Sequence, residues 1–284
     1  MTDLDAIEAL LAEERIREAR AALEEGPDEG VETALGWRRA LRRAQLDLRE
    51  PRVPVDETVL AVEALIDAPA FEAELPRAHA LRIDGYAAKR CFALTERAIA
   101  EAREALGAHP RVLLSEGRAM MGFDERERAH ACLAKAIEAG GEAEDAARHA
   151  LADALYVLGD FDAAIAEARR VGPGPTRLRA LRLIASCHAA RQDPEAEAEA
   201  WAKVLGEGEG SDHAQDDRIS HALALAGTGR RADALEALGE AWRMSPDSGA
   251  GRYARERMSH LERHLEGGRR QRLAAFPTTS QKWN

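Results

Sequence analysis

The sequence has few aromatic residues, and this shortage limits the folds open to it. Five Phe, four Trp and three Tyr make up only 4% of the 284 residues. A β-sandwich draws its core from β-branched and aromatic side chains, so this composition argues against an all-β fold. The core has to be built from Ala, Leu and Val, which suits helices that approach one another closely.

Cysteine is also scarce. The three cysteines, Cys91, Cys132 and Cys187, are odd in number, far apart and set within helical patterns. They therefore predict neither a disulfide framework nor a zinc site, and they favour a reduced, cytoplasmic protein. No metal and no cofactor are expected.

Long apolar runs are missing too. Mean hydropathy is −0.41, and no run of about 18 apolar residues is present to span a membrane. The acidic start, Met1 to Asp5, has neither the basic stretch nor the apolar core of a signal peptide. Lysine is rare as well, and the excess of Arg and Ala hints at a GC-rich bacterial genome.

The balance of charge argues against nucleic acid as a partner. Forty Lys and Arg stand against 51 Asp and Glu, a net charge of −11, whereas a nucleic-acid binder must neutralise many phosphates. Arg38, Arg39, Arg42 and Arg43 form a basic stretch opposite the apolar stripe of their helix. We interpret it as a solvated face, because no aromatic residues alternate with these arginines.

A repeated stripe of small residues organises the middle of the chain. Each stripe has residues at spacings of four and three, which places them on one face of a helix. The stripes begin at Ala98, Ala129, Ala164, Ala198 and Ala234, at intervals of 31, 35, 34 and 36 residues. Before each stripe lies another apolar helical segment and a short break. Gly at a break can end one helix, and Asp can cap the next. The breaks are Gly122-Phe123-Asp124, Gly159-Asp160-Phe161, Gln192-Asp193-Pro194 and Gly229-Arg230-Arg231.

This pattern resembles the tetratricopeptide repeat family. The resemblance is carried by Leu151-Ala152-x2-Leu155-x3-Gly159-Asp160-Phe161-x2-Ala164 and by Ala222-x2-Leu225-x3-Gly229-x4-Ala234-x3-Leu238-x2-Ala241-x4-Pro246. It implies an all-α fold, an α-solenoid of about five helix-turn-helix repeats with helical caps. It also implies a protein-binding module, without naming a ligand.

We therefore predict four regions. Residues 1–74 form an irregular helical region, either diverged repeats or a cap, with helices expected from Leu10 to Leu23 and from Ala34 to Leu48. Residues 75–246 hold the repeats. Residues 247–268 form a capping helix with a stripe of Ala254, Met258, Leu261 and Leu265, ended by Gly267-Gly268. Residues 269–284 form a basic tail.

No complete catalytic constellation is present, so we predict no enzymatic activity and no catalytic residues. His260 and His264 have the i, i+4 spacing of metal ligands, but no third ligand is evident besides Glu256. Cys187-His188 are neighbours on a helix and point in different directions, which does not suit a thiol nucleophile and its base. Phosphate-binding loops and serine-hydrolase motifs are absent from the sequence.

The predicted binding surface is the concave groove lined by the first helices of the pairs. The residues that lie off the packing stripe of each first helix should point into this groove. They are His109, Val112, Glu116, His149, Asp153, Tyr156, Arg179, Arg182, Ser186, Asp216 and Ile219. Arg pairs with carboxylates through two parallel hydrogen bonds. We therefore expect a peptide or helix with an acidic side chain or a free carboxylate, anchored by Arg179 and Arg182. Neither nucleic acid nor a membrane is expected as a partner.

The last nine residues, Phe276 to Asn284, resemble the segment that leads to the nucleophile of papain-like cysteine peptidases of the bacteriocin-processing type. The resemblance implies that Gln281 is an oxyanion-hole donor and that the catalytic Cys lies beyond this chain. The alternative function is therefore the N-terminal substrate-binding or regulatory region of a larger peptidase.

Overall fold

The computed structural model describes residues 3–12, 15–26, 30–50, 53–174, 176–208 and 210–275. Within these ranges the regular elements are all helices. The chain divides into an N-terminal unit, Met1–Cys187 with Gly210–Asp212, and a C-terminal unit, His188–Glu209 with His213–Asn284.

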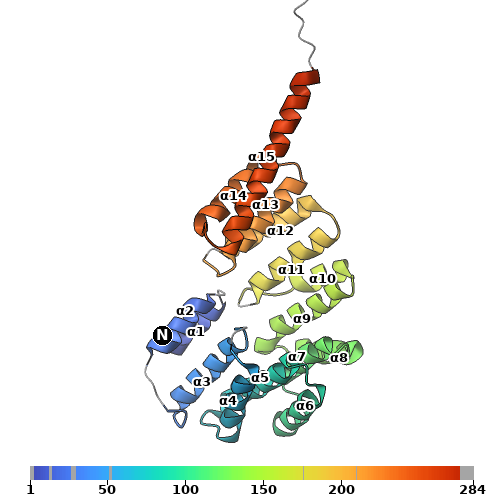
Figure 1. The fold of residues 1–284 in the computed structure, drawn as a ribbon. Helices are drawn as coiled ribbons and strands as arrows, with labels where there is room; N and C mark the ends of the chain where they lie inside the picture. The colour runs from blue at the N-terminus through green and yellow to red at the C-terminus, as the bar shows by residue number, and fades with distance from the viewer. Residues whose placement is uncertain are drawn as a thin grey trace, which may run out of the picture. The chain divides into compact units, whose positions relative to one another are not determined.

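Helices follow one another along the whole described chain (Figure 1). The N-terminal unit contains α1 (Asp3–Ala12), α2 (Ile16–Glu25), α3 (Ala34–Asp47), α4 (Val55–Asp67), η1 (Glu72–Glu74), α5 (Leu75–Ala88), α6 (Phe92–Leu106), α7 (Pro110–Gly122), α8 (Arg126–Ala139), η2 (Gly141–Ala143), α9 (Glu144–Val157) and α10 (Phe161–Arg169). Helix α11 (Arg177–Ala190) begins in this unit and ends in the other. The C-terminal unit continues with α12 (Pro194–Glu207), α13 (Ala214–Gly227), α14 (Arg231–Met244) and α15 (Gly249–Ala275).

A left-handed turn residue marks each of the five helix pairs between α5 and α14. These residues have positive φ and lie two positions before the second helix of the pair: Arg90, Asp124, Gly159, Gln192 and Gly229. They recur at intervals of 34, 35, 33 and 37 residues. The predicted unit of helix, tight turn and helix is thereby confirmed, and the fold is an all-α helical-repeat solenoid.

Side-chain caps start some of the second helices as predicted. Asp160 accepts a hydrogen bond from the backbone N–H of Ala163 at 3.2 Å, and Asp193 accepts one from Ala196 at 3.1 Å. Each satisfies a backbone donor that the first turn of a helix leaves unpaired. Asp124 differs because it is itself the left-handed turn residue, so it does not cap α8.

The small-residue stripe forms the core of the helix pairs, but in two of the five helices the predicted stripe does not begin at the equivalent position. Ala129, Ala164 and Ala234 are fully buried, each three residues after the start of its helix. In α6 the buried residue at that place is Thr95, and Ala98 lies one turn later. In α12 the predicted stripe residue Ala202 is exposed, while Ala200 and Val204 are buried.

The N-terminal helices also depart from expectation. The single helix predicted from Leu10 to Leu23 is wrong, because α1 ends at Ala12 and α2 begins at Ile16. The two helices fold onto each other, and Leu4, Ile7, Leu11, Ala19, Leu23 and Leu46 form one buried cluster. A straight helix cannot bring these residues together. The helix predicted from Ala34 to Leu48 is observed as α3, with Trp37, Leu41 and Ala44 buried.

The arginines of α3 are not a uniformly solvated face, which corrects the interpretation of that stretch. Arg42 is buried and forms ion pairs with Glu8 of α1 and Glu74 of η1, the latter at 2.6 Å. Arg39 is also buried and donates to the carbonyl oxygen of Leu23. Their partners lie on other helices, so the sequence of α3 alone does not reveal them.

The final helix is longer than predicted. Ala254 is buried and Met258 and Leu261 pack beside it, in a cluster with Leu238 and Ala241 of α14. The helix continues through Gly267-Gly268 to Ala275, so the predicted end at these glycines is wrong. The segment with the peptidase-like pattern, 276–284, lies outside the described residues.

Candidate functional site

A cavity of about 420 Å³ lies between α7, α9 and α11 of the N-terminal unit. Its lining residues are Arg118, Met121 and Gly122 from α7, then His149, Ala150, Asp153, Ala154 and Val157 from α9, and Arg179 from α11. This volume falls within the range of roughly 300–1,000 Å³ that ligand pockets occupy.

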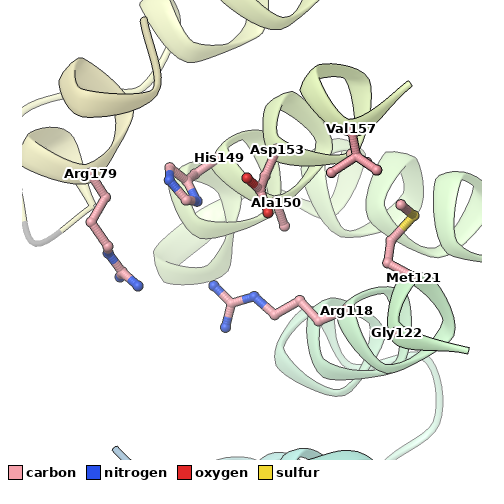
Figure 2. A pocket seen from close by; sticks show the side chains of 9 residues that line it. Arg118, Met121, Gly122, His149, Ala150, Asp153, Val157 and Arg179 are labelled. Atoms are coloured by element: carbon pink, nitrogen blue, oxygen red, sulfur yellow. The ribbon is translucent and has the colours of Figure 1, made fainter. Parts of the chain in front are cut away.

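Helical spacing gathers these side chains on one face of each helix. On α7 the lining residues stand at i, i+3 and i+4, and on α9 His149, Asp153 and Val157 are each four residues apart. Residues at these spacings lie on one side of a helix. Figure 2 shows Arg118 and Arg179 extending from α7 and α11 toward the same space, with His149 and Asp153 beside it.

The lining of the cavity combines polar and apolar side chains. Arg118, Arg179, His149 and Asp153 supply charge and hydrogen-bonding groups, whereas Met121, Ala150, Ala154 and Val157 supply apolar surface. Two guanidinium groups face one carboxylate, so the lining carries a net positive charge in a chain whose overall charge is −11.

Acidic and basic residues alternate along neighbouring first helices. Asp84, Arg118 and Asp153 each stand six residues before the left-handed turn residue of their pair. Desolvation raises the pKa of Asp153, and the positive charge of Arg118 opposes that rise. Desolvation also raises the pKa of Asp84, against the charges of Arg118, Arg111 and Arg49 and a hydrogen bond with Ser115. Arg118 therefore acts on both carboxyl groups.

The structure brings three of the eight predicted site residues together. His149, Asp153 and Arg179 line the cavity. Tyr156 packs against Phe161, with ring centroids 5.6 Å apart, and is not among the lining residues. Asp216 is exposed on α13 of the C-terminal unit.

Two other predicted residues have local partners. His109 is the N-cap of α7, and its Nδ1 accepts a hydrogen bond from the backbone N–H of Arg111 at 3.2 Å. Arg182 is half-buried and lies 3.4 Å from the hydroxyl oxygen of Ser211, to which it donates. Neither side chain lines the cavity.

Glu116 is not a surface residue, and its predicted orientation into the groove is wrong. Its side chain is 0% exposed and is ion-paired with Arg103 at 2.7 Å and with Arg128 at 2.9 Å. Val112 and Ile219, expected on the same groove, are buried as well. The arginines from α6 and α8 hold Glu116 within the packed helices, away from the cavity.

Sequence reasoning missed Arg118 and Met121. Helix α7 packs against α5, α6, α8 and α9, so every residue from Val112 to Gly117 is buried. Only a narrow face remains accessible, and it includes Arg111, Arg118 and Gly122. Their spacing of seven and four residues is the signal that would have found this face.

The other candidate chemistry lacks a suitable environment. Desolvation raises the pKa of Cys132 to about 11, and the neighbouring Glu116 adds to the rise, so its thiol stays protonated at neutral pH. In the described part of the chain, no group of three His, Cys, Asp or Glu side chains is placed to hold a metal ion. His260 is exposed on α15, and the side chain of His264 lies outside the described residues. Among the helices of the described segments, none is long and apolar enough to cross a membrane.

The fold connects this chain to known proteins, although its sequence does not. No family model and no curated protein matches the sequence. Among solved structures, a chain of the APC/C hetero-tetramer Cut9-Hcn1 is 11% identical with a TM-score of 0.58, over 90% of this chain and 48% of that one. PilW, a widely conserved type IV pilus biogenesis factor, is 14% identical with a TM-score of 0.56, over 75% and 96% of the two chains.

The present chain thus spans about half the length of its Cut9-Hcn1 match. At these identities the likeness shows the fold alone. That fold is a helical-repeat solenoid, as the resemblance to tetratricopeptide repeats implied.

Proposed function

We propose that this protein is an interaction scaffold that binds a segment of another protein in the cavity between α7, α9 and α11. The observation that carries the proposal is the pair of arginines, Arg118 and Arg179, that line one cavity from two different helices. Helical-repeat proteins use such surfaces, built from successive repeats, to hold extended partners.

The chemistry of the cavity favours an acidic partner. A guanidinium group donates two parallel hydrogen bonds to a carboxylate, and Arg is enriched where interface energy concentrates. The bound segment would place an acidic side chain or a free carboxylate between Arg118 and Arg179. Asp153, on the same wall, would repel a second negative charge and so favour a segment with a single acid at this place.

This assignment changes one of the predicted anchors. Arg179 keeps its role, whereas Arg118 replaces Arg182, whose side chain lies beside Ser211. We also propose a cytoplasmic location, because Cys91, Cys132 and Cys187 are odd in number and far apart in the sequence, which does not suit the disulfide framework of a secreted protein.

The test is a selection of binding peptides with the full chain. A phage library of random dodecapeptides is panned against the protein, and dissociation constants of the enriched peptides are measured by fluorescence anisotropy. We expect enriched peptides to share an acidic residue. The double variant Arg118→Gln/Arg179→Gln should weaken their binding by about 30-fold, equivalent to about 2 kcal/mol.

A matched control removes the same charge elsewhere. Arg169 and Arg231 are exposed on α10 and α14, so Arg169→Gln/Arg231→Gln should bind as tightly as the parent. If the cavity variant and this control bind the peptides equally, the proposed site is wrong.

A further inference from the structure

Large apolar side chains are exposed at the end of α9, beside the cavity. Val157 is 69% exposed and Leu158 is 51% exposed, and they are consecutive in the chain. Val157 also lines the cavity, together with Met121 of α7. Exposed apolar residues that gather in one place mark interaction sites more often than scattered ones do.

The buried stripe of α9 leads directly to these two residues. Ala147, Ala150 and Ala154 lie on that stripe and are buried. The next positions, three and four residues after Ala154, are Val157 and Leu158. They continue the core-facing pattern of the helix, but the described residues do not cover Val157 and Leu158 to the degree that they cover the alanines.

The other turns provide an internal comparison. The two residues before the left-handed residue are Ala88-Lys89, Gly122-Phe123, Val157-Leu158, Ala190-Arg191 and Gly227-Thr228 in the five pairs. Large apolar side chains occur only in the second and third of these turns. These are the two turns that border the cavity, through Gly122 and Val157.

The apolar surface reaches one turn further. The rings of Phe123 and Phe92 meet edge to face, with centroids 5.1 Å apart, and Phe92 is exposed. Arg90 donates to the carbonyl oxygen of Gly122 at 2.5 Å, which ties these two turns together. We call Phe92, Met121, Phe123, Val157 and Leu158 the apolar strip.

We propose that the apolar strip and the cavity form one composite site for an amphipathic protein segment. The segment would place its acidic side chain between Arg118 and Arg179 and an apolar side chain on Met121, Val157 and Leu158. This inference rests on the proposed function and adds a second requirement to the partner. Asp124, Glu125 and Asp160 are exposed at the same turns, which disfavours an anionic lipid surface as the occupant.

The experiment compares the peptides that different variants select from the random dodecapeptide library. Val157→Ser/Leu158→Ser removes the apolar contact, and both side chains are exposed enough for folding to tolerate the change. Leu60→Ser is the matched control, since Leu60 is 65% exposed on α4. Thermal unfolding followed by circular dichroism checks that all variants are folded.

We expect the parent and Leu60→Ser to enrich peptides with both an acid and a nearby Leu, Ile, Val, Met or Phe. Val157→Ser/Leu158→Ser should retain the preference for an acid and lose the preference for the apolar residue. Replacing that residue by Ser in a selected peptide should weaken binding to the parent about tenfold, and should leave binding to the double variant unchanged.

Three results would overturn the inference. The parent could select acidic peptides without an apolar preference, which leaves the proposed function standing. The double variant could select the same apolar residues as the parent, which would exclude Val157 and Leu158 as the apolar contact and also leave the proposed function standing. The double variant could instead lose affinity equally for peptides with the apolar residue and with Ser in its place, which indicates a structural effect. Failure of the proposed function itself would appear as selection without any acid.

Discussion

Helices α7 and α13 are the first helices of their pairs, one in each unit, yet their accessible surfaces differ in chemistry. Six residues before the left-handed turn, α7 carries Arg118 and α13 carries Leu223. Arg118 lines the cavity, whereas Leu223 packs against the cluster of Ile219 and Leu238. The turn and the buried stripe fix the fold in both units. The remaining positions are free to differ, and the candidate site is made from them.

The buried charge of α7 is the largest expected difference between the two helices. Glu116 stands eight residues before the turn, and the same place in α13 holds His221, which is half-buried. Glu116→Ala breaks the buried ion-pair network with Arg103 and Arg128 and leaves a void among the packed helices, so it should lower the free energy of unfolding by about 3 kcal/mol. His221→Ala should cost about 1 kcal/mol or less. Urea unfolding of both variants measures these losses, and equal losses would contradict a special role for the Glu116 network.

The shared stripe should respond alike in both units. Ala164 and Ala234 are fully buried at the same place in α10 and α14. Ala164→Leu and Ala234→Leu should each overpack a helix contact and cost about 1–3 kcal/mol. Ala202→Leu is the control, because Ala202 is exposed and its change should shift the melting temperature little. An unchanged melting temperature for Ala234→Leu would count against the repeat register.

The smallest expected effect concerns pH and the charges of the cavity. The pKa of Asp153 is raised by desolvation, so as pH falls this carboxyl becomes neutral before an ordinary aspartate does. The cavity then gains positive charge, and an acidic peptide should bind about threefold more tightly until its own carboxyl protonates near pH 4. Asp153→Asn removes this contribution and leaves that of Asp84, whose pKa is also raised by desolvation. Anisotropy titrations from neutral pH down to about pH 4 should therefore show a weaker pH dependence of the dissociation constant for the variant. An identical dependence for the parent and the variant would exclude Asp153 as the cause.

The same residue links pH to stability. Because its folded-state pKa is raised, the protonated form of Asp153 favours the folded state, and that contribution is lost as pH rises through the raised pKa. Asp153→Asn is therefore expected to fold at neutral pH at least as well as the parent.

The repeat was predictable from the sequence because its turns leave a strong local signal. Gly159 and Gly229 take the left-handed conformation that glycine permits most readily, and Asp160 caps the helix that follows. Alanine spacing was a weaker guide. In a chain rich in Ala, alanines three or four residues apart recur without sharing a structural role. The predicted stripe was therefore wrong in α6, where Thr95 takes the place expected for Ala98, and in α12, where Ala202 is exposed.

The candidate site was only partly predictable, for a reason of packing. His149, Asp153 and Arg179 were found because α9 and α11 each leave a polar face accessible along the expected phase. The predicted groove-facing positions were wrong on α7, because the four helices packed against it bury Glu116 and leave Arg118 accessible. Arg42 shows the same limit, since its partners Glu8 and Glu74 are more than thirty residues away in sequence.

The hydrophobic clusters have a consequence for how cooperatively the chain unfolds. One set of buried residues, Val59, Ile83 and Ala98, comes from consecutive helices of the N-terminal unit, and another, Ile219, Leu238 and Ala254, comes from consecutive helices of the C-terminal unit. Each set joins helices that are close in sequence, so few distant segments have to find one another before a core forms. In a linear array of this kind, stability is a sum over neighbouring interfaces. Heat or denaturant should then unfold neighbouring helix pairs progressively rather than the whole chain in one step.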